Sequence, residues 1–130
     1  MSELLAAVPQ FTVPDLVRTV EYYRDVFGFQ IAGWWDGEQM TAVPRDPVFA
    51  IVVRDQVRVF FNLGTKPLDT GRVDPAYDVF IQMKGVDELA SEFRARGAEI
   101  LEGPGDRVYG QREMVIRDCN GLVLCFAEAQ

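Results

Sequence analysis

The sequence predicts an α+β protein built from two βαβββ modules that form a cupped mixed sheet. Its 130 residues fit a single domain, residues 1–130, that is large enough to bury a core without disulfides or a metal. Strand and helix patterns follow the same order in both halves of the chain, and a linker over 64–76, rich in proline and glycine, separates them. The modules are expected to span about 7–63 and 77–128. Neither is large enough to bury its helix and sheet alone, so the two must pack together.

The first module opens with a strand and a helix. Residues 7–13 alternate like a short strand, with Pro9 near its start or on an edge, where proline is tolerated. Asp15 is a good N-cap, and apolar residues then recur at helical spacing until Gly28. This spacing predicts a helix over 16–27.

Three strands complete the first module. Residues 29–35 are rich in β-branched and aromatic side chains and end at an Asp-Gly turn signal. The polar stretch 38–46 contains proline and is typical of a loop. Residues 48–53 and 57–63 are separated by a short polar turn, which predicts a β-hairpin.

The second module repeats this order. Its predicted elements are a strand over 78–83, a helix over 86–96 stopped by Gly97, and strands over 99–101, over 113–117 and up to Phe126. Aligning the halves pairs Val13 with Met83, Leu16 with Val86, Tyr23 with Phe93 and Arg24 with Arg94. The identities are few, so the repeat is carried by the order of the elements.

Alternation along the strands predicts which side chains face the helices. The core sets are Val57, Val59 and Phe61; Val79, Ile81 and Met83; and Leu122, Leu124 and Phe126. The opposite face then holds Arg58, Phe60 and Asn62; Asp78, Phe80 and Gln82; and Val123 and Cys125. This second face is neither polar nor fully apolar, and such a mixed lining is what a ligand pocket requires.

Composition excludes several classes of function. With 13 Lys and Arg against 20 Asp and Glu, the net charge of −7 argues against a nucleic-acid partner. The chain has no histidine, which rules out Ser-His-Asp and Cys-His catalysis and any His-rich metal site. Cys119 and Cys125 fit reduced, incidental thiols and a cytoplasmic location. No segment has the length or pattern of a membrane span or a signal peptide, so no membrane partner is expected.

Two motifs resemble a known family across nearly the whole chain. The first is Val13-Pro14-Asp15-Leu16 leading to Tyr22-Tyr23-Arg24-Asp25-Val26-Phe27-Gly28-Phe29. The second is Tyr109-Gly110-Gln111-Arg112-Glu113 leading to Ile116-Arg117-Asp118-Cys119-Asn120-Gly121, with Cys119 where the family usually has proline. Both resemble the vicinal oxygen chelate superfamily, which includes glyoxalase I, extradiol dioxygenases, fosfomycin-resistance enzymes and bleomycin-resistance proteins.

The resemblance places the family's metal-ligand positions on residues that do not form a metal site. Three of the four positions fall on Val8, Asp78 and Cys125, and the other lies among Arg58, Phe60 and Asn62. Valine cannot ligate a metal, and a lone carboxylate with a thiol mixes hard and soft donors. The expectation is therefore no metal and no cofactor.

This departure from the metal-binding pattern implies the non-catalytic branch similar to bleomycin-resistance protein. Members of that branch are acidic homodimers that hold an antibiotic in two grooves at the dimer interface. The implied function is sequestration of a bulky aromatic antibiotic, either bleomycin-type or anthraquinone-enediyne-type, with a modest preference for the second. The alternatives are a metal-dependent lyase, isomerase or dioxygenase with an unusual ligand set, and a metal-free biosynthetic accessory protein.

The candidate ligand-binding residues follow from the strand faces and from the resemblance. They are Trp34, Trp35, Phe49, Arg58, Phe60, Asn62, Asp78, Phe80, Tyr109, Gln111 and Met114. Neighbouring strand residues face opposite ways, so one of the two tryptophans is free to stack on a ligand unless both cover a dimer interface. Phe49 could equally be a core residue, a core role is the commoner case for a methionine such as Met114, and Asp78 could instead form an ion pair with Arg58.

Overall fold

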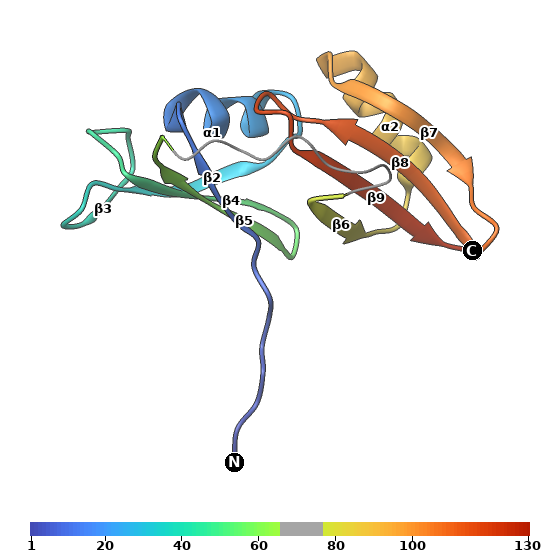
Figure 1. The fold of residues 1–130 in the computed structure, drawn as a ribbon, viewed down its shortest axis with the longest axis horizontal. Coiled ribbons are helices and arrows are strands. Elements are labelled where there is room, and N and C mark those ends of the chain that lie inside the picture. The colour runs from blue at the N-terminus through green and yellow to red at the C-terminus, as the bar shows by residue number, and fades with distance from the viewer. Residues whose placement is uncertain (66–76) are drawn as a thin grey trace.

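The computed structural model describes residues 1–65 and 77–130, so the predicted linker lies almost wholly outside the described residues. The first module comprises β1 (Gln10–Val13), α1 (Leu16–Asp25), β2 (Gln30–Trp35), β3 (Met40–Thr41), β4 (Phe49–Arg54) and β5 (Val57–Leu63). The second comprises β6 (Val79–Gln82), α2 (Val86–Arg96), β7 (Glu99–Asp106), β8 (Gln111–Arg117) and β9 (Val123–Ala129). Figure 1 shows the two modules side by side, each with one helix against its own sheet.

The strand orders confirm the predicted fold class. The first sheet has the order β1-β5-β4-β2-β3 and the second β6-β9-β8-β7. In both sheets the first strand of the module runs parallel to its last strand, while the neighbouring strands pair antiparallel. The two modules therefore share one topology, to which the first adds the short strand β3.

Both helices begin and end at residues whose chemistry explains the boundary. The Asp15 carboxylate accepts the backbone N–H of Arg18 at 3.1 Å and caps α1. Gly97 adopts φ 82° after α2, a left-handed conformation that glycine reaches at low cost. The N-terminus of α2 is held by the Glu128 carboxylate, which accepts the N–H groups of Gly85 and Val86 at 3.0 and 3.1 Å.

Several boundaries differ from those that the sequence predicts: the helix predicted over 16–27 ends at Asp25, and several strands start or end one to three residues away from their predicted limits. Three of the differences follow from strand pairing. The first strand begins at Gln10, where its pairing with β5 starts, instead of at residue 7. The predicted loop 38–46 contains β3, because Met40 and Thr41 pair with the two tryptophans of β2. The strand predicted over 99–101 continues to Asp106, and two register shifts against β8 interrupt its alternation.

The two modules pack through their helix sides. Phe27 lies 5.3 Å from Phe93 between ring centroids, and Phe93 lies 5.4 Å from Phe126. The Tyr23 hydroxyl donates to the buried carboxylate of Asp118 at 2.7 Å and so joins α1 to the turn between β8 and β9. These contacts merge the helix-side residues of both sheets into one core.

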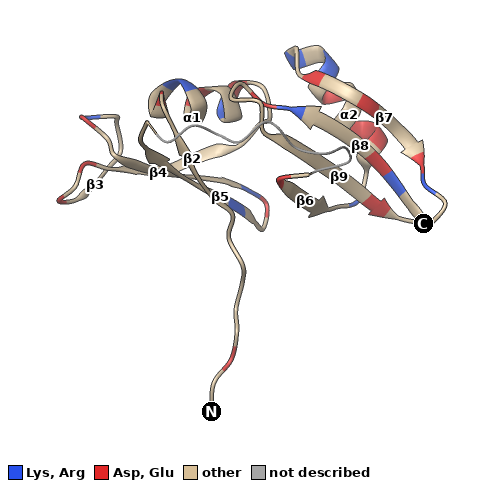
Figure 2. Cartoon of the chain, viewed as in Figure 1, with Lys and Arg blue, Asp and Glu red and all other residues tan. Residues whose placement is uncertain are grey.

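The predicted strand faces are confirmed. Val59, Phe61, Ile81, Leu124 and Phe126 are buried with the helices. We call the opposite side of each sheet its far face. Figure 2 shows charged residues on both helices and on β7 and β8, whereas β2 has none. Among the described residues, no helix combines the length and apolar character needed to span a membrane.

Candidate ligand-binding site

The far face of the first sheet carries a row of aromatic side chains. Trp35 on β2 pairs in register with Phe49 on β4, and the Phe49 and Phe60 rings meet edge to face at 5.4 Å. Asn62 lies beside Phe49 in the register of β5, and Arg58 is exposed two positions before Phe60. This surface combines stacking rings with one amide and one cation.

Two predicted site residues belong to the core instead. Trp34 is 2% exposed and Met114 is fully buried, and both lie on the helix side of their sheets. For Trp34 the reason is its register with Ala50, which places the indole under α1, so Trp35 is the tryptophan left on the far face. For Met114 the reason is its register with Phe126, a residue of the helix-side core.

The far face of the second sheet is partly apolar and carries an exposed ring. Phe80 is 47% exposed, and its centroid lies 6.4 Å from that of Tyr77. Beneath them Cys125, Val115 and Ala127 form a small apolar cluster. Burial, together with the nearby Glu113 carboxylate, raises the pKa of the Cys125 thiol to about 12. A thiol in that state is a poor nucleophile at neutral pH.

A buried carboxylate that the sequence did not single out for binding lies beside this cluster. The Glu113 side chain is inaccessible to solvent, and it accepts a hydrogen bond from Arg107 Nε at 3.2 Å and one from the Tyr109 hydroxyl at 2.6 Å. The sequence predicts Tyr109 as a site residue without this partner, although the parity of β8 already puts Glu113 on the far face with Gln111 and Val115. Tyr77, beside Phe80, and Arg107, beside Glu113, are the other residues of this region that sequence reasoning missed.

The remaining predicted residues lie at the edges of this face. The Asp78 carboxylate accepts the backbone N–H of Val123 at 2.8 Å, so it helps to hold β6 beside β9. Gln111 begins β8, half-buried, opposite Ala129. The structure therefore places Asp78, Phe80, Tyr109 and Gln111 in the second module and Trp35, Phe49, Arg58, Phe60 and Asn62 in the first.

The residues at the family's metal positions do not assemble a metal site. Val8 offers no donor atom, and the carboxylate of Asp78 is engaged by a backbone N–H. The Cys125 thiol remains protonated. Within residues 1–65 and 77–130, no three Cys, Asp or Glu side chains converge as ligands.

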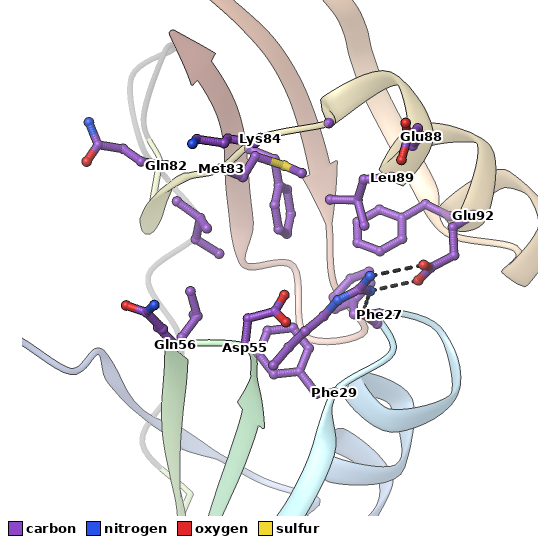
Figure 3. Close-up of a pocket in the computed structure, with 16 residues that line it drawn as sticks. Phe27, Phe29, Asp55, Gln56, Gln82, Met83, Lys84, Glu88, Leu89 and Glu92 are labelled. Carbon is purple, nitrogen blue, oxygen red and sulfur yellow. Dashed lines mark hydrogen bonds and ion pairs between the residues drawn. The ribbon is translucent and has the colours of Figure 1, made fainter.

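A cavity of about 630 Å³ lies between the modules, beside the turn that joins β4 to β5 and the segment that joins β6 to α2 (Figure 3). Its floor consists of core side chains, among them Phe27, Phe93 and Phe126, which are almost fully buried. None of the eleven predicted site residues lines it. Because the cavity exposes little aromatic surface, the far faces offer the better stacking surface.

Comparison with solved structures gives neighbours that match almost the full chain. TioX from Micromonospora sp. ML1 is 21% identical with a TM-score of 0.73, over 95% of this chain and 97% of that one. The bleomycin-binding protein of Streptomyces verticillus, complexed with copper(II)-bleomycin, is 22% identical with a TM-score of 0.71 over both full chains. TnmS3, an antibiotic binding protein from Streptomyces sp. CB03234, is 17% identical with a TM-score of 0.67, over 99% of this chain and all of that one.

No curated protein matches the sequence significantly. The model of the Glyoxalase/Bleomycin resistance protein/Dioxygenase superfamily, however, matches residues 6–126, nearly the whole chain and both predicted motifs. The doubled topology and this match agree, and the chain belongs to that superfamily.

Proposed function

We propose that this protein binds and sequesters a bulky aromatic natural-product antibiotic, of the bleomycin or anthraquinone-enediyne type, without altering it and thereby confers resistance. The observation that carries the proposal is the aromatic surface on the far faces, formed by Trp35, Phe49 and Phe60 on one sheet and by Phe80 and Tyr109 on the other. Flat ring systems stack on such surfaces, and each buried ring contributes both apolar area and preferred geometry. Two structural neighbours are described as a bleomycin-binding protein and an antibiotic binding protein, which supports the ligand class.

The chemistry of the residues on these faces favours binding over turnover. The Cys125 thiol is protonated at neutral pH, and the Glu113 carboxylate is already occupied by Arg107 and Tyr109. A metal-dependent enzyme of the same superfamily is the alternative. Stoichiometric nickel, zinc, manganese or iron that survives dialysis would favour that alternative over sequestration.

We further propose that the binding unit is a homodimer. The far faces are the sides of the sheets opposite to α1 and α2, and a second copy facing them would enclose the ligand. An N-terminal arm before β1 extends away from both modules in Figure 1 and exposes the side chains of Met1, Leu4 and Leu5. Apolar side chains in such an arm suit contact with another copy. We expect light scattering to give about 29 kDa, twice the 14.7 kDa of one chain.

Ligand titration tests the proposed function directly. Copper(II)-bleomycin and an anthraquinone-fused enediyne are each added to the purified protein while tryptophan fluorescence is followed. Quenching at micromolar ligand is expected, and Trp35→Phe should remove most of it because Trp34 is buried on the helix side. Mass spectrometry of the recovered ligand should show no change in mass. The absence of quenching with either compound, or a chemically altered ligand, would overturn the proposal.

The two cysteines of the chain, Cys119 and Cys125, are free thiols. We therefore place the sequestration in a reducing cytoplasm, where an antibiotic would be held away from its target.

A further inference from the structure

Tyr109 combines two properties that rarely occur in one side chain. It is 59% exposed, on the connection between β7 and β8, yet its hydroxyl reaches the fully buried carboxylate of Glu113 at 2.6 Å. This bond raises the pKa of the Tyr109 phenol to about 12, with burial of the hydroxyl as a second cause. The exposed ring is thus fixed at its far end.

The carboxylate that holds the ring has a second partner besides Tyr109. Arg107 Nε donates to Glu113 at 3.2 Å, and the same guanidinium donates through NH2 to Glu102 at 2.6 Å. From the other side Gly103 approaches the Glu113 backbone so closely that a Cβ on residue 103 would overlap with the Glu113 carbonyl oxygen. Glu113 therefore has a charged partner on its side chain and a close backbone neighbour on its strand.

A fixed exposed ring differs physically from an ordinary surface tyrosine. A free aromatic side chain loses rotamer freedom when a ligand stacks on it, and that loss weakens binding. A ring that is already anchored through its hydroxyl does not lose that freedom again. Charge-assisted O–H···O⁻ bonds of this length are among the stronger hydrogen bonds in proteins.

Building on the proposed function, we propose that Tyr109 is a preorganised stacking platform for the planar aromatic part of the ligand and that Glu113 is the residue that positions it. Phe80 and Tyr77, whose ring centroids lie 6.4 Å apart, add further ring surface to the same far face. The platform therefore selects ligands with a flat ring system over flexible apolar chains.

Three variants separate the ring from its anchor. Tyr109→Phe keeps the ring and removes the anchor, and we expect the anthraquinone-fused enediyne to bind about threefold to tenfold more weakly. Tyr109→Ala removes the ring as well, and we expect a loss of about tenfold or more. Glu113→Gln keeps the shape of the acceptor but not its charge. Its affinity for the enediyne should lie between those of the wild type and Tyr109→Phe. Tyr22→Phe, on the distant helix α1, is the matched control and should bind like the wild type.

A second measurement detects the anchor without any ligand. In protein labelled at the tyrosine Cζ carbon, the Tyr109 signal, identified by its absence in Tyr109→Phe, should not titrate below about pH 11. In Glu113→Gln it should titrate closer to the ordinary range near pH 10. A role of Glu113 in folding alone would not produce that change in a protein that remains folded.

The outcomes are distinct. If the wild type binds neither antibiotic, the proposed function falls and this inference falls with it. If the wild type binds but Tyr109→Ala binds equally well, only the platform is wrong. If Tyr109→Ala is weak while Tyr109→Phe equals the wild type, or the Tyr109 signal titrates normally, the anchoring role of Glu113 is wrong.

Discussion

Trp34 and Glu113 show how far a single position can be predicted from the sequence. Strand alternation shows that only one of the two tryptophans faces the helix, but the register shift between Ile31 and Gly33 hides which one. For Glu113 the alternation gives the correct face, and its burial was still missed because charged residues are expected in solvent. Its partners, Arg107 and Tyr109, lie on the connection between β7 and β8, and the sequence does not specify the path of that connection.

At the same scale, removal of the Tyr23 hydroxyl from the core is expected to be costly. It donates to the Asp118 carboxylate at 2.7 Å, and both groups are buried. Tyr23→Phe keeps the ring and leaves the carboxylate one donor short, so the free energy of unfolding should fall by about 2 kcal/mol. Urea denaturation followed by circular dichroism measures this loss.

Tyr22→Phe is the matched control for this prediction, because the neighbouring ring is only half-buried. It should change the free energy of unfolding by less than about 0.5 kcal/mol. Equal losses in the two variants would show that the bond between Tyr23 and Asp118 contributes nothing specific.

At the scale of elements, boundaries were predicted best where a local signal marks them. The helix over 86–96 was predicted to the residue, because its acidic first turn, its basic last turn and Gly97 all agree. The strand over 99–101 was predicted too short, because the register shifts in β7 depend on its pairing with β8. Pairing with β2 also accounts for β3, because its two residues have no periodicity from which a strand could be predicted.

The Glu128 cap of α2 gives an element-scale prediction about pH. The N–H groups of Gly85 and Val86 hold the pKa of Glu128 below its ordinary value. A depressed folded-state pKa means that the cap stabilises the protein above the unfolded value of about 4.3 and loses that contribution as the pH falls through the folded value. Glu128→Gln should therefore be less stable than the wild type at neutral pH, and the difference should shrink below about pH 4.

Urea midpoints of the two proteins, measured across the acid range, check this prediction. Glu3→Gln, in the exposed N-terminal arm, should match the wild type at every pH. A stability difference for Glu128→Gln that stays constant from neutral to acid pH would contradict a role for the carboxylate charge.

At the scale of the whole molecule, the repeat predicted the doubled topology, but not how the halves meet. Helix-side residues of both modules merge into one core, so the far faces remain as the surfaces on which a ligand or a second copy would act. That arrangement rests on contacts between residues far apart in the chain, such as those of Tyr23 with Asp118 and of Arg54 with Glu92. No local pattern encodes such pairs.

Arg54 is the residue expected to couple the two modules. Its NH1 donates to the Phe27 carbonyl and to Glu92 Oε2, both at 2.7 Å, and its NH2 donates to Glu92 Oε1 at 3.0 Å (Figure 3). Arg54→Lys keeps the charge but cannot reproduce this fork, because an ammonium is a single donor point. With both side chains about one-third exposed, we expect a loss of about 1 kcal/mol in the free energy of unfolding.

Arg24→Lys, whose ion pairs lie within α1 and at its end, should lose less than half as much. A single urea transition with an unchanged slope should persist in both variants, because Phe27 and Phe93 still join the modules. Equal stability of Arg54→Lys and the wild type would show that the fork contributes nothing to the coupling of the modules, whereas two separate transitions would show that the fork was holding them together.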